Sequence, residues 1–332
     1  MLLTPCVAYK CYSEKAKYNY KFSKKFIKVF FIFFILLFSS FFSFILAKNL
    51  NLQEDYIYLL KEGESYSSIK KSLKNLDITI PFVIDLYFYL TGSDKSLRKG
   101  EYKLERNSNL FVISNNLSEG NVFYRSFYIP EGSEVSQFLS LEEQNKFCKF
   151  KGLDDCKLEG MLHPNTYFCE AGENLNNILN EAFNIQLLIA EEQFKKLNTN
   201  KLVKNVYELI ILASILEKES CFEERSLISG VIYNRLEKRM KLQIDSTVIY
   251  GIKDFDGNLT KLNLKNKTPF NTYTNFGLPP TPISMPSKSS LIAAGNPLKS
   301  DYFYFVSKGK CAHEFSVDYS DHLKAIQKYQ LN

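Results

Sequence analysis

The most apolar stretch of the chain lies near its beginning. Residues 29–47, VFFIFFILLFSSFFSFILA, carry no charged side chain and are interrupted only by serines. A helix needs roughly 20 apolar residues to cross the hydrocarbon core of a bilayer. A cleaved signal peptide has a shorter apolar region and a small-x-small cleavage site, which residues 45–47 (ILA) match poorly. The pattern therefore predicts an uncleaved transmembrane helix at residues 29–47.

A small module of mixed type is predicted at residues 48–122. Its pattern changes between short helical and strand-like stretches, bounded by glycine, proline or serine. Ser65 is expected to cap the first helix, and Pro81 suits the first turn of the second. The expected elements are a helix after Ser65, a helix at residues 81–90, a strand at residues 100–104 and a helix at residues 109–117.

From residue 123 onward the pattern predicts a larger α+β domain that extends to residue 332. Beyond residue 240 the chain becomes turn-rich and aromatic-rich, with the sequence GLPPTP at residues 277–282. Long loops in a compact domain are usually functional or disordered, and these have few runs of charge, which favours a binding cleft. The expected elements are a strand at residues 123–129, helices at residues 174–197, 207–219 and 226–240, and a strand at residues 302–306.

The net charge of the chain is concentrated before the transmembrane segment. Lys and Arg number 42 against 36 Asp and Glu, a net charge of +6. Residues 1–28 hold seven lysines and one acid, so they account for the whole excess and leave 35 basic and 35 acidic residues in the rest. A neutral body gives no sign of a nucleic-acid surface. Because positive segments stay on the cytoplasmic side, we expect a single-pass protein of the cytoplasmic (inner) membrane with its N-terminus inside. Residues 48–332 would lie outside, in the periplasm if an outer membrane exists.

Cysteine spacing indicates disulfides rather than a metal site. Five of the seven cysteines follow the transmembrane segment, and in an oxidising exterior they could form at most two disulfides, leaving one over. Cys148, Cys156 and Cys169 are the closest in sequence, and spacing alone does not select a pair. No CxxC pair occurs, and the three histidines have no metal-ligand spacing with the cysteines, so we expect no metal and no cofactor.

One carboxylate falls on the apolar side of a predicted helix. At about 100° per residue, Glu219 lies about 20° from Leu212, within the apolar arc of residues 207–219, while Ser214, Glu217 and Lys218 lie on the opposite side. A carboxyl group placed there should be partly desolvated, which raises its pKa and suits it to act as a general acid. Two alternatives stay open. Glu219 could sit in solvent at a frayed helix end, and Glu208 shares the same arc.

A series of motifs runs in order through the second half of the chain. They are ASILEKES at residues 213–220, YNRL at 233–236, LQIDSTVIYG at 242–251, FNTYT at 270–274, GLPP at 277–280, AA at 293–294 with NP at 296–297, and YFV at 304–306 followed by His313 and Phe315. This series resembles the endolytic murein transglycosylases of the YceG-like (MltG) family, and the resemblance covers most of residues 123–332. The module at residues 48–122 resembles the LysM-like domain of these proteins, through GES at 63–65 and GEY at 100–102.

The resemblance implies a catalytic glutamate within residues 217–219. Lytic transglycosylases of other families have a catalytic Glu followed by Ser, which Glu219 and Ser220 match, and the helical periodicity selects Glu219 over Glu217. The residues expected to bind sugar are Ser220, Gln243, Asp245, Tyr250, Asn271, Tyr273 and His313. Local turn and cap bonding is the alternative role for these side chains, and a structural role is the alternative for His313.

The activity implied by the resemblance is cleavage of the bond between N-acetylmuramic acid (MurNAc) and N-acetylglucosamine (GlcNAc) within peptidoglycan strands. It would leave 1,6-anhydroMurNAc ends and limit the length of nascent strands. The implied partners are the glycan strands, the membrane and peptidoglycan synthases. Asn165 and Ser246 depart from the family pattern, which has Asp and Pro there, but neither lies in the Glu-Lys-Glu-Ser stretch.

Two other classes of function are compatible with the sequence. A true hydrolase of the muramidase type would need a second carboxylate, for which Asp245 is the candidate. A non-catalytic wall-binding scaffold would use the small module to hold glycan and would need no acid at position 219.

Overall fold

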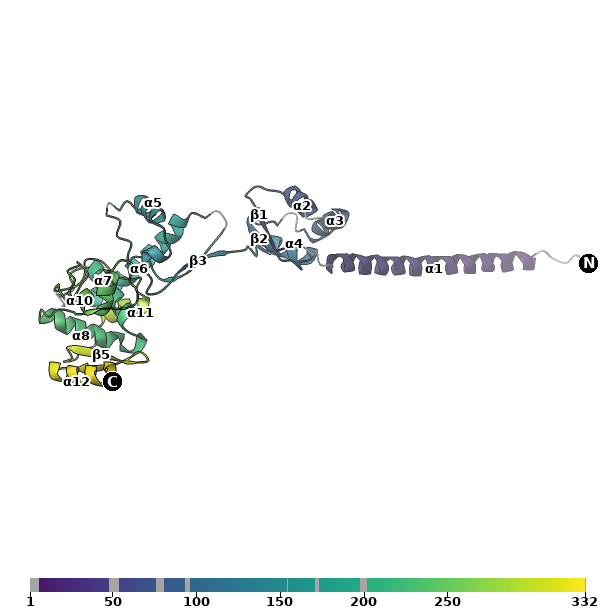
Figure 1. The fold of residues 1–332 in the computed structure, drawn as a ribbon. Coiled ribbons are helices and arrows are strands. Elements are labelled where there is room, and N and C mark those ends of the chain that lie inside the picture. Colours follow the sequence, from purple (N-terminus) through teal and green to yellow (C-terminus); the bar gives the residue numbers. More distant parts are fainter. Residues whose placement is uncertain are drawn as a thin grey trace, which may run out of the picture. The chain divides into compact units, whose positions relative to one another are not determined.

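The structure of the chain, a computed structural model, describes residues 6–47, 54–75, 81–92, 96–153, 155–170, 173–197 and 202–331 (Figure 1). Its contacts divide the chain at Arg125 into two compact units. The expected mixed α+β class is confirmed, because helices and short antiparallel strands occur in both units.

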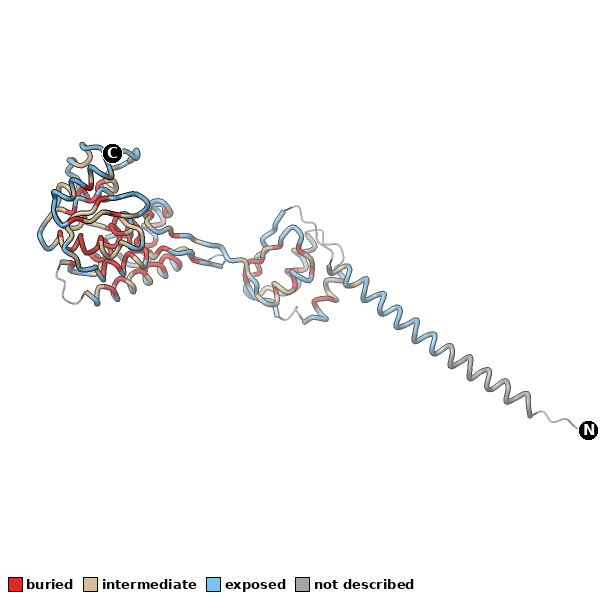
Figure 2. The backbone as a smooth tube through the Cα atoms, turned by 90° about the horizontal axis from the view of Figure 1, so that it is seen from below, coloured by how far each residue is buried: buried red, intermediate tan, exposed pale blue. Residues whose placement is uncertain are grey.

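Unit 1 begins with one long helix, α1 (Cys6–Ala47). Its stretch Lys24–Ile45 has a mean hydropathy of 2.3 and is, among the described residues, the one helix long and apolar enough to cross a membrane. Its apolar side chains are largely exposed, as Figure 2 shows along the described part of the helix. The expected apolar helix is therefore present, and the lysine-rich segment before it continues the same helix.

A small module completes unit 1. Strands β1 (Tyr56–Leu60) and β2 (Gly100–Leu104) pair antiparallel, and helices α2 (Tyr66–Asn75), α3 (Pro81–Thr91) and α4 (Leu110–Glu119) surround them. The side chains of Ile69, Phe88, Tyr102 and Ile113 are almost fully buried between these elements. The sequence predicted α2, α3, β2 and α4, but not β1.

Unit 2 contains the larger core. Its elements are β3 (Arg125–Ile129), the 3-10 turn η1 (Val135–Gln137), α5 (Leu141–Lys151), β4 (Asn165–Cys169), α6 (Leu175–Lys196), α7 (Val206–Glu219), the 3-10 turn η2 (Phe222–Glu224), α8 (Arg225–Glu237), α9 (Asp245–Tyr250), α10 (Lys261–Lys265), α11 (Lys288–Gly295), β5 (Tyr304–Gly309), β6 (Ala312–Ser316) and α12 (Tyr319–Gln330). Strands β3 and β4 pair with each other, and β5 and β6 form an antiparallel hairpin.

Helix α7 is the central element of unit 2. It packs against α6, α8, α9 and α11, and every residue from 209 to 216 is buried. Asn205 caps the helix at its start, where its side chain accepts a hydrogen bond from the Glu208 amide at 2.9 Å. On the expected polar side, Ser214 and the side chain of Glu217 are therefore buried as well, while Lys218 is exposed. The region after residue 240, expected to be irregular, contains three short helices and ends in the unpredicted helix α12.

Two disulfides form, which is the largest number that the cysteines after α1 allow. Cys148 bonds to Cys156, eight residues away, and Cys221 bonds to Cys311 across a separation of 90 residues. Cys169 belongs to neither bond. The second disulfide joins the loop directly after α7 to the turn of the β5–β6 hairpin.

Candidate active site

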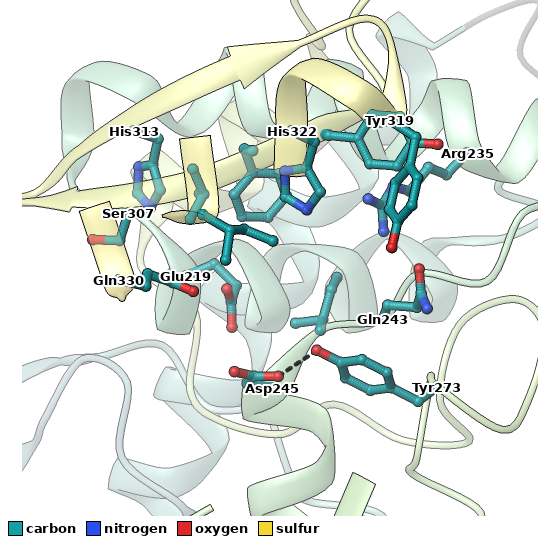
Figure 3. Close-up of a pocket in the computed structure, with 15 residues that line it drawn as sticks. Glu219, Arg235, Gln243, Asp245, Tyr273, Ser307, His313, Tyr319, His322 and Gln330 are labelled. Atoms are coloured by element: carbon teal, nitrogen blue, oxygen red, sulfur yellow. Dashed lines mark hydrogen bonds between the residues drawn. The ribbon is translucent and has the colours of Figure 1, made fainter. Parts of the chain in front are cut away.

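A pocket of about 380 Å³ opens where the end of α7 meets the start of α9, the β5–β6 hairpin and α12 (Figure 3). Of the predicted site residues, Glu219, Gln243, Asp245, Tyr273 and His313 line it. These five side chains lie up to 94 positions apart in the sequence. The pocket is polar and is walled on one side by aromatic rings from β5 and α12.

Glu219 is the last residue of α7 and lies at the edge of this pocket. The helix ends after it because Ser220 turns to an extended conformation, while the Ser220 hydroxyl donates to the Leu216 carbonyl at 2.8 Å. Burial raises the pKa of Glu219, and the negative charge of Asp245 raises it further. The Ser246 hydroxyl and amide, together with His313, favour the charged form and oppose that rise. The raised pKa predicted from the helical pattern is confirmed in direction.

Asp245 and Tyr273 face the same pocket as a hydrogen-bonded pair. The Tyr273 hydroxyl donates to the Asp245 carboxylate across 2.6 Å, the contact drawn in Figure 3. Burial and the Asp245 carboxylate both raise the pKa of Tyr273, so the phenol keeps its proton and stays a donor. Asp245 itself is exposed at the start of α9. A ligand in the pocket can therefore still reach its carboxylate.

A buried network fixes the turn that carries Gln243 and Asp245. The Ile244 amide donates to the Thr272 hydroxyl at 2.9 Å, and the Gln243 amide donates to the Thr272 carbonyl at 3.2 Å. Gln243 has φ 48°, in the left-handed region that non-glycine residues rarely adopt. Such outliers cluster at functional sites. Here the conformation leaves the Gln243 side chain exposed at the pocket.

Three predicted residues lie outside the lining of the pocket. Asn271 is fully buried: its amide group donates to the Asn266 carbonyl at 2.6 Å, and its side-chain oxygen accepts the Tyr273 amide at 2.8 Å. Tyr250 donates to Glu159 at 3.2 Å and packs against Phe270. Ser220 ends α7. Asn271 thus shapes the loop that presents Tyr273.

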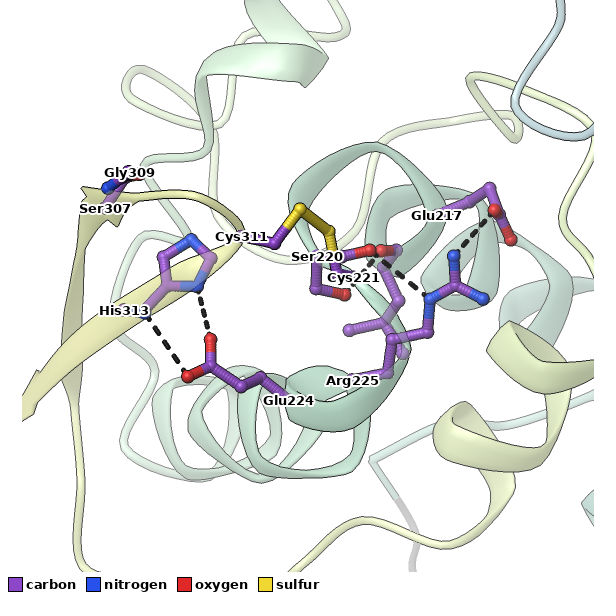
Figure 4. Close-up of a disulfide and its surroundings, with 10 residues drawn as sticks. Glu217, Ser220, Cys221, Glu224, Arg225, Ser307, Gly309, Cys311 and His313 are labelled. Atoms are coloured by element: carbon purple, nitrogen blue, oxygen red, sulfur yellow. Dashed lines mark hydrogen bonds and ion pairs between the residues drawn. A yellow bond between two sulfur atoms is a disulfide. The ribbon is translucent and has the colours of Figure 1, made fainter.

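His313 is held by a carboxylate that the sequence did not single out. Its Nδ1 lies 2.7 Å from a carboxylate oxygen of Glu224, and its backbone amide donates to the other oxygen at 3.3 Å (Figure 4). The side chain is only 9% exposed. The Cys221–Cys311 disulfide closes beside this pair, and so fixes the hairpin over the loop after Glu219.

Glu217 has a different environment from Glu219. It forms an ion pair with Arg225 at 2.8 Å and accepts hydrogen bonds from Ser287 and Ser290, with its side chain only 5% exposed. The helical wheel placed Glu217 opposite the apolar arc, and that side faces α11. Its carboxylate is thus held by an ion pair and by hydrogen bonds from the start of α11.

Several lining residues were not predicted. Arg235 from α8, Tyr304 from β5, and Tyr319 and His322 from α12 complete the pocket. The signal that could have found Arg235 is the YNRL motif to which it belongs. The polar sequence of α12 gave no such signal for Tyr319 or His322. Within the described parts of the chain, no group of three or more His, Cys, Asp or Glu side chains could hold a metal ion.

Comparison with known proteins identifies the family. The model of the YceG-like family matches residues 58–328. The chain belongs to the YceG-like family.

Relatives within and around this family carry a consistent name. The chain is 28% identical over 302 residues to the endolytic murein transglycosylase of Bacillus subtilis, covering 81% of this chain and 83% of that protein. It is 32% identical over 162 residues to the protein of the same name from Streptococcus pneumoniae, covering 46% of this chain and 28% of that one. The crystal structure of a putative yceG-like protein from Listeria monocytogenes aligns with a TM-score of 0.52 at 28% identity, over 82% of this chain and 99% of the other.

Proposed function

We propose that this YceG-like protein is a membrane-anchored endolytic lytic transglycosylase that cleaves MurNAc–GlcNAc bonds within peptidoglycan strands. The observation that carries the proposal is Glu219, a buried carboxyl group with a raised pKa at the edge of a polar pocket. The names of the relatives support the same reaction class.

Glu219 would act first as an acid and then as a base. It would protonate the oxygen that leaves C1 of MurNAc, and the glycosidic bond would break. The resulting carboxylate would then accept the proton of the C6 hydroxyl of the same sugar as that oxygen bonds to C1. The proton gained by the leaving sugar is thus replaced on Glu219, and the product is a 1,6-anhydro end. Intramolecular attack of this kind has a large effective-molarity advantage over attack by solvent.

The neighbours of Glu219 would hold the sugars. Gln243 and the Asp245–Tyr273 pair offer an amide, a carboxylate and a phenol to sugar hydroxyl groups at one pocket. Tyr319 offers an aromatic ring on the opposite wall. The names of the relatives, endolytic murein transglycosylases, support cleavage within strands.

One observation favours a second candidate, a hydrolase of the muramidase type. Asp245 lies close enough to Glu219 for its charge to raise the pKa of that group, and it is exposed to the pocket. Glycoside hydrolases usually use two carboxyl groups, one on each side of the scissile bond. In a hydrolase mechanism, Asp245 would activate a water molecule.

Digestion of purified glycan strands in heavy-oxygen water decides between the two. The transglycosylase yields 1,6-anhydroMurNAc ends without label, while a hydrolase yields reducing ends that carry the label at C1. Mass analysis of the products distinguishes them directly. A scaffold without activity would give neither product, and the Glu219→Gln variant would then be indistinguishable from the unchanged protein.

The remaining parts of the chain fit this role. Lys24–Ile45 would anchor the protein in the cytoplasmic membrane with residues 48–332 outside, near newly made strands. The small module of unit 1, which resembles LysM-like domains in sequence, would contact glycan. Limiting the length of nascent strands, together with peptidoglycan synthases, would be the biological outcome.

A further inference from the structure

Arg235 is a buried cation that forms no ion pair with a carboxylate in the described part of the chain. It is only 6% exposed and lines the same pocket as Glu219. Its Nε donates to the Phe303 carbonyl and its Nη1 to the Leu242 carbonyl, both at 2.6 Å. Its Nη2 makes no hydrogen bond to any residue in the described part of the chain. The two N–H donors of Nη2 are therefore the ones left for a ligand.

This arrangement is costly unless an anion completes it. Arginine is almost never fully buried without a partner, because desolvating its charge costs several kcal/mol. Burial accordingly lowers the pKa of Arg235, and the groups that oppose this are the phenols of Tyr304 and Tyr273 rather than any carboxylate. The carbonyls of Phe303 and Leu242, with a longer bond to that of Lys241 at 3.5 Å, fix the guanidinium plane. The guanidinium carbon also lies 5.3 Å from the centroid of the Tyr304 ring, a cation–π contact. The charge is thus held rigidly at the pocket by carbonyls and an aromatic ring, without the negative charge of a carboxylate among the described residues.

A second polar group without a partner lies on the same wall. His322 from α12 lines the pocket, and its Nδ1 is buried without a hydrogen-bond partner in the described structure. Its ring stacks on Tyr304 with centroids 5.0 Å apart. Burial, and then the charge of Arg235, lower the pKa of His322, so the imidazole is neutral near pH 7. A neutral ring can donate one further hydrogen bond.

The pocket therefore has two chemically distinct sides. Figure 3 shows Arg235 beside Gln243 and Tyr319, on the side opposite His313. Glu219 and Asp245 supply acidic groups, and Arg235 supplies a fixed positive charge. A substrate that fits this pocket would place the neutral bond to be cleaved at Glu219 and an anionic substituent at Arg235.

We propose that Arg235, with His322 beside it, forms a carboxylate-binding subsite that recognises the substituent on the lactyl arm of MurNAc. This inference rests on the proposed function, since it takes the glycan strand as the ligand of the pocket. The carboxylate has two possible sources: the lactyl group itself in strands without peptides, or the stem peptide attached to it. Hydrogen bonds between charged groups are roughly twice as strong as neutral ones, so the subsite would select anionic strands.

The test uses the unchanged protein, full length in detergent, and varies the substrate. Strands with peptides, and strands stripped of them by an amidase, are each compared with a form whose carboxylates are converted to methylamides. Losing one charged hydrogen bond, about 1.5–3 kcal/mol, should raise KM by about 10- to 150-fold with little change in kcat. The pair of substrates that shows this loss identifies the source of the carboxylate. A change in KM below about twofold in both pairs overturns the subsite.

Variants link the effect to Arg235. Arg235→Gln should remove the discrimination between carboxylate and methylamide, whereas Arg239→Gln, at an exposed arginine just beyond α8, should keep it. Because Arg235 also bonds two carbonyls, its replacement affects folding. His322→Phe avoids this, since it preserves the stacked ring and removes only the nitrogen atoms. It should lose part of the discrimination, and full discrimination in this variant would remove His322 from the subsite.

The same experiment separates the two proposals. If all strands are cleaved to anhydro ends equally well, the subsite is wrong and the transglycosylase stands. If no strand is cleaved, but the Glu219→Gln variant binds carboxylate strands at least tenfold more tightly than methylamide strands, the subsite stands and the activity fails. Equal binding without cleavage contradicts both.

Discussion

The Tyr273 hydroxyl donates a 2.6 Å hydrogen bond to Asp245, whose charge in turn raises the pKa of Glu219. This pair connects the loop after α10 to the start of α9 and places a phenol and a carboxylate in the pocket. In the proposed mechanism, the strength of this hydrogen bond would therefore affect both sugar binding and proton donation by Glu219.

Tyr273→Phe should lower kcat/KM by about tenfold to a hundredfold, because a hydrogen bond to a charged group contributes about 1.5–3 kcal/mol. Asp245→Asn should retain part of the activity if Asp245 only positions sugar. Steady-state kinetics on soluble strands measures both effects. Tyr302→Phe, at a tyrosine outside this pocket, is the matched control and should behave as the unchanged protein. Complete loss of activity in Asp245→Asn would favour the hydrolase.

The two glutamates of α7 should respond in opposite ways to replacement by glutamine. Glu219→Gln removes a transferable proton, so activity should fall by about 100- to 10,000-fold while stability stays unchanged or rises. Glu217→Gln breaks an ion pair with Arg225 whose groups are 5% and 11% exposed. That should destabilise the fold by about 3–5 kcal/mol, with a milder effect on the activity of the folded fraction. Urea unfolding and turnover assays on both variants give the comparison, and a reversed pattern would assign catalysis to Glu217.

The sequence predicted those parts of the site that depend on residues close together in the chain, and missed those that depend on distant residues. Helix α7 and Glu219 were found because local periodicity and a motif agreed there. The burial of Glu217 was missed because a helical wheel assumes one solvated side, while α6, α8, α9 and α11 surround α7. Arg235 was missed as a site residue because its bonded carbonyl at Phe303 lies 68 positions away.

Two of the elements that the sequence did not predict, α12 and β1, show the physical reasons. In α12 only Ala325 is buried, so the sequence of this helix has no apolar stretch from which it could be predicted. Strand β1 depends on its pairing with β2, across more than 40 residues of sequence, for its hydrogen bonds. Asn271 was predicted to bind sugar, with local turn bonding as the alternative, and its bonds to backbone carbonyls became visible only in three dimensions.

Stability should fall as the pH rises from about 4.5 to 7, and Glu159 should account for much of the fall. Burial raises the pKa of Glu159 to about 7, against hydrogen bonds from the Val135 amide and the Tyr250 hydroxyl. A folded-state pKa above the unfolded value means that ionisation disfavours the native state. The free energy of unfolding should therefore drop between these pH values, by up to about 3 kcal/mol.

Urea titrations at several pH values test this. Glu159→Gln should flatten the slope, whereas Glu131→Gln, at an exposed glutamate in the turn after β3, should leave it unchanged. An unaltered slope in Glu159→Gln would place the titrating group elsewhere.

The two disulfides should differ in their contribution to stability. In the chain-entropy model, a bridge across 90 residues contributes about 4–5 kcal/mol and one across eight contributes about 2–3 kcal/mol. Replacing Cys221 and Cys311 by serine should therefore lower the melting temperature more than replacing Cys148 and Cys156. Activity should fall as well in the first variant, because the released hairpin carries His313 and part of the pocket wall. Equal losses in thermal unfolding would contradict this order.

A reporter enzyme that is active only outside the cytoplasm should be active when fused after Asn332. The lysines precede the apolar helix and so hold its first end inside. A fusion of the same reporter after Lys28, before the apolar segment, serves as the control and should be inactive. Activity in the cytoplasm for the first fusion would remove access to the wall, and with it the proposed substrate.

The Cys221–Cys311 bond turns the segment between these residues into a covalent ring. The ring contains four residues of the pocket: Arg235, Gln243, Asp245 and Tyr273. Glu219 lies two positions before the first cysteine of the ring, and His313 lies two positions after the second. The spacing of those two side chains is therefore governed by the bridge and not by the length of the chain within the ring. Insertions in a loop such as residues 252–260, none of which lines the pocket, should therefore leave the positions of Glu219 and His313 unchanged. A chain break in that loop would leave both pieces covalently joined by the disulfide.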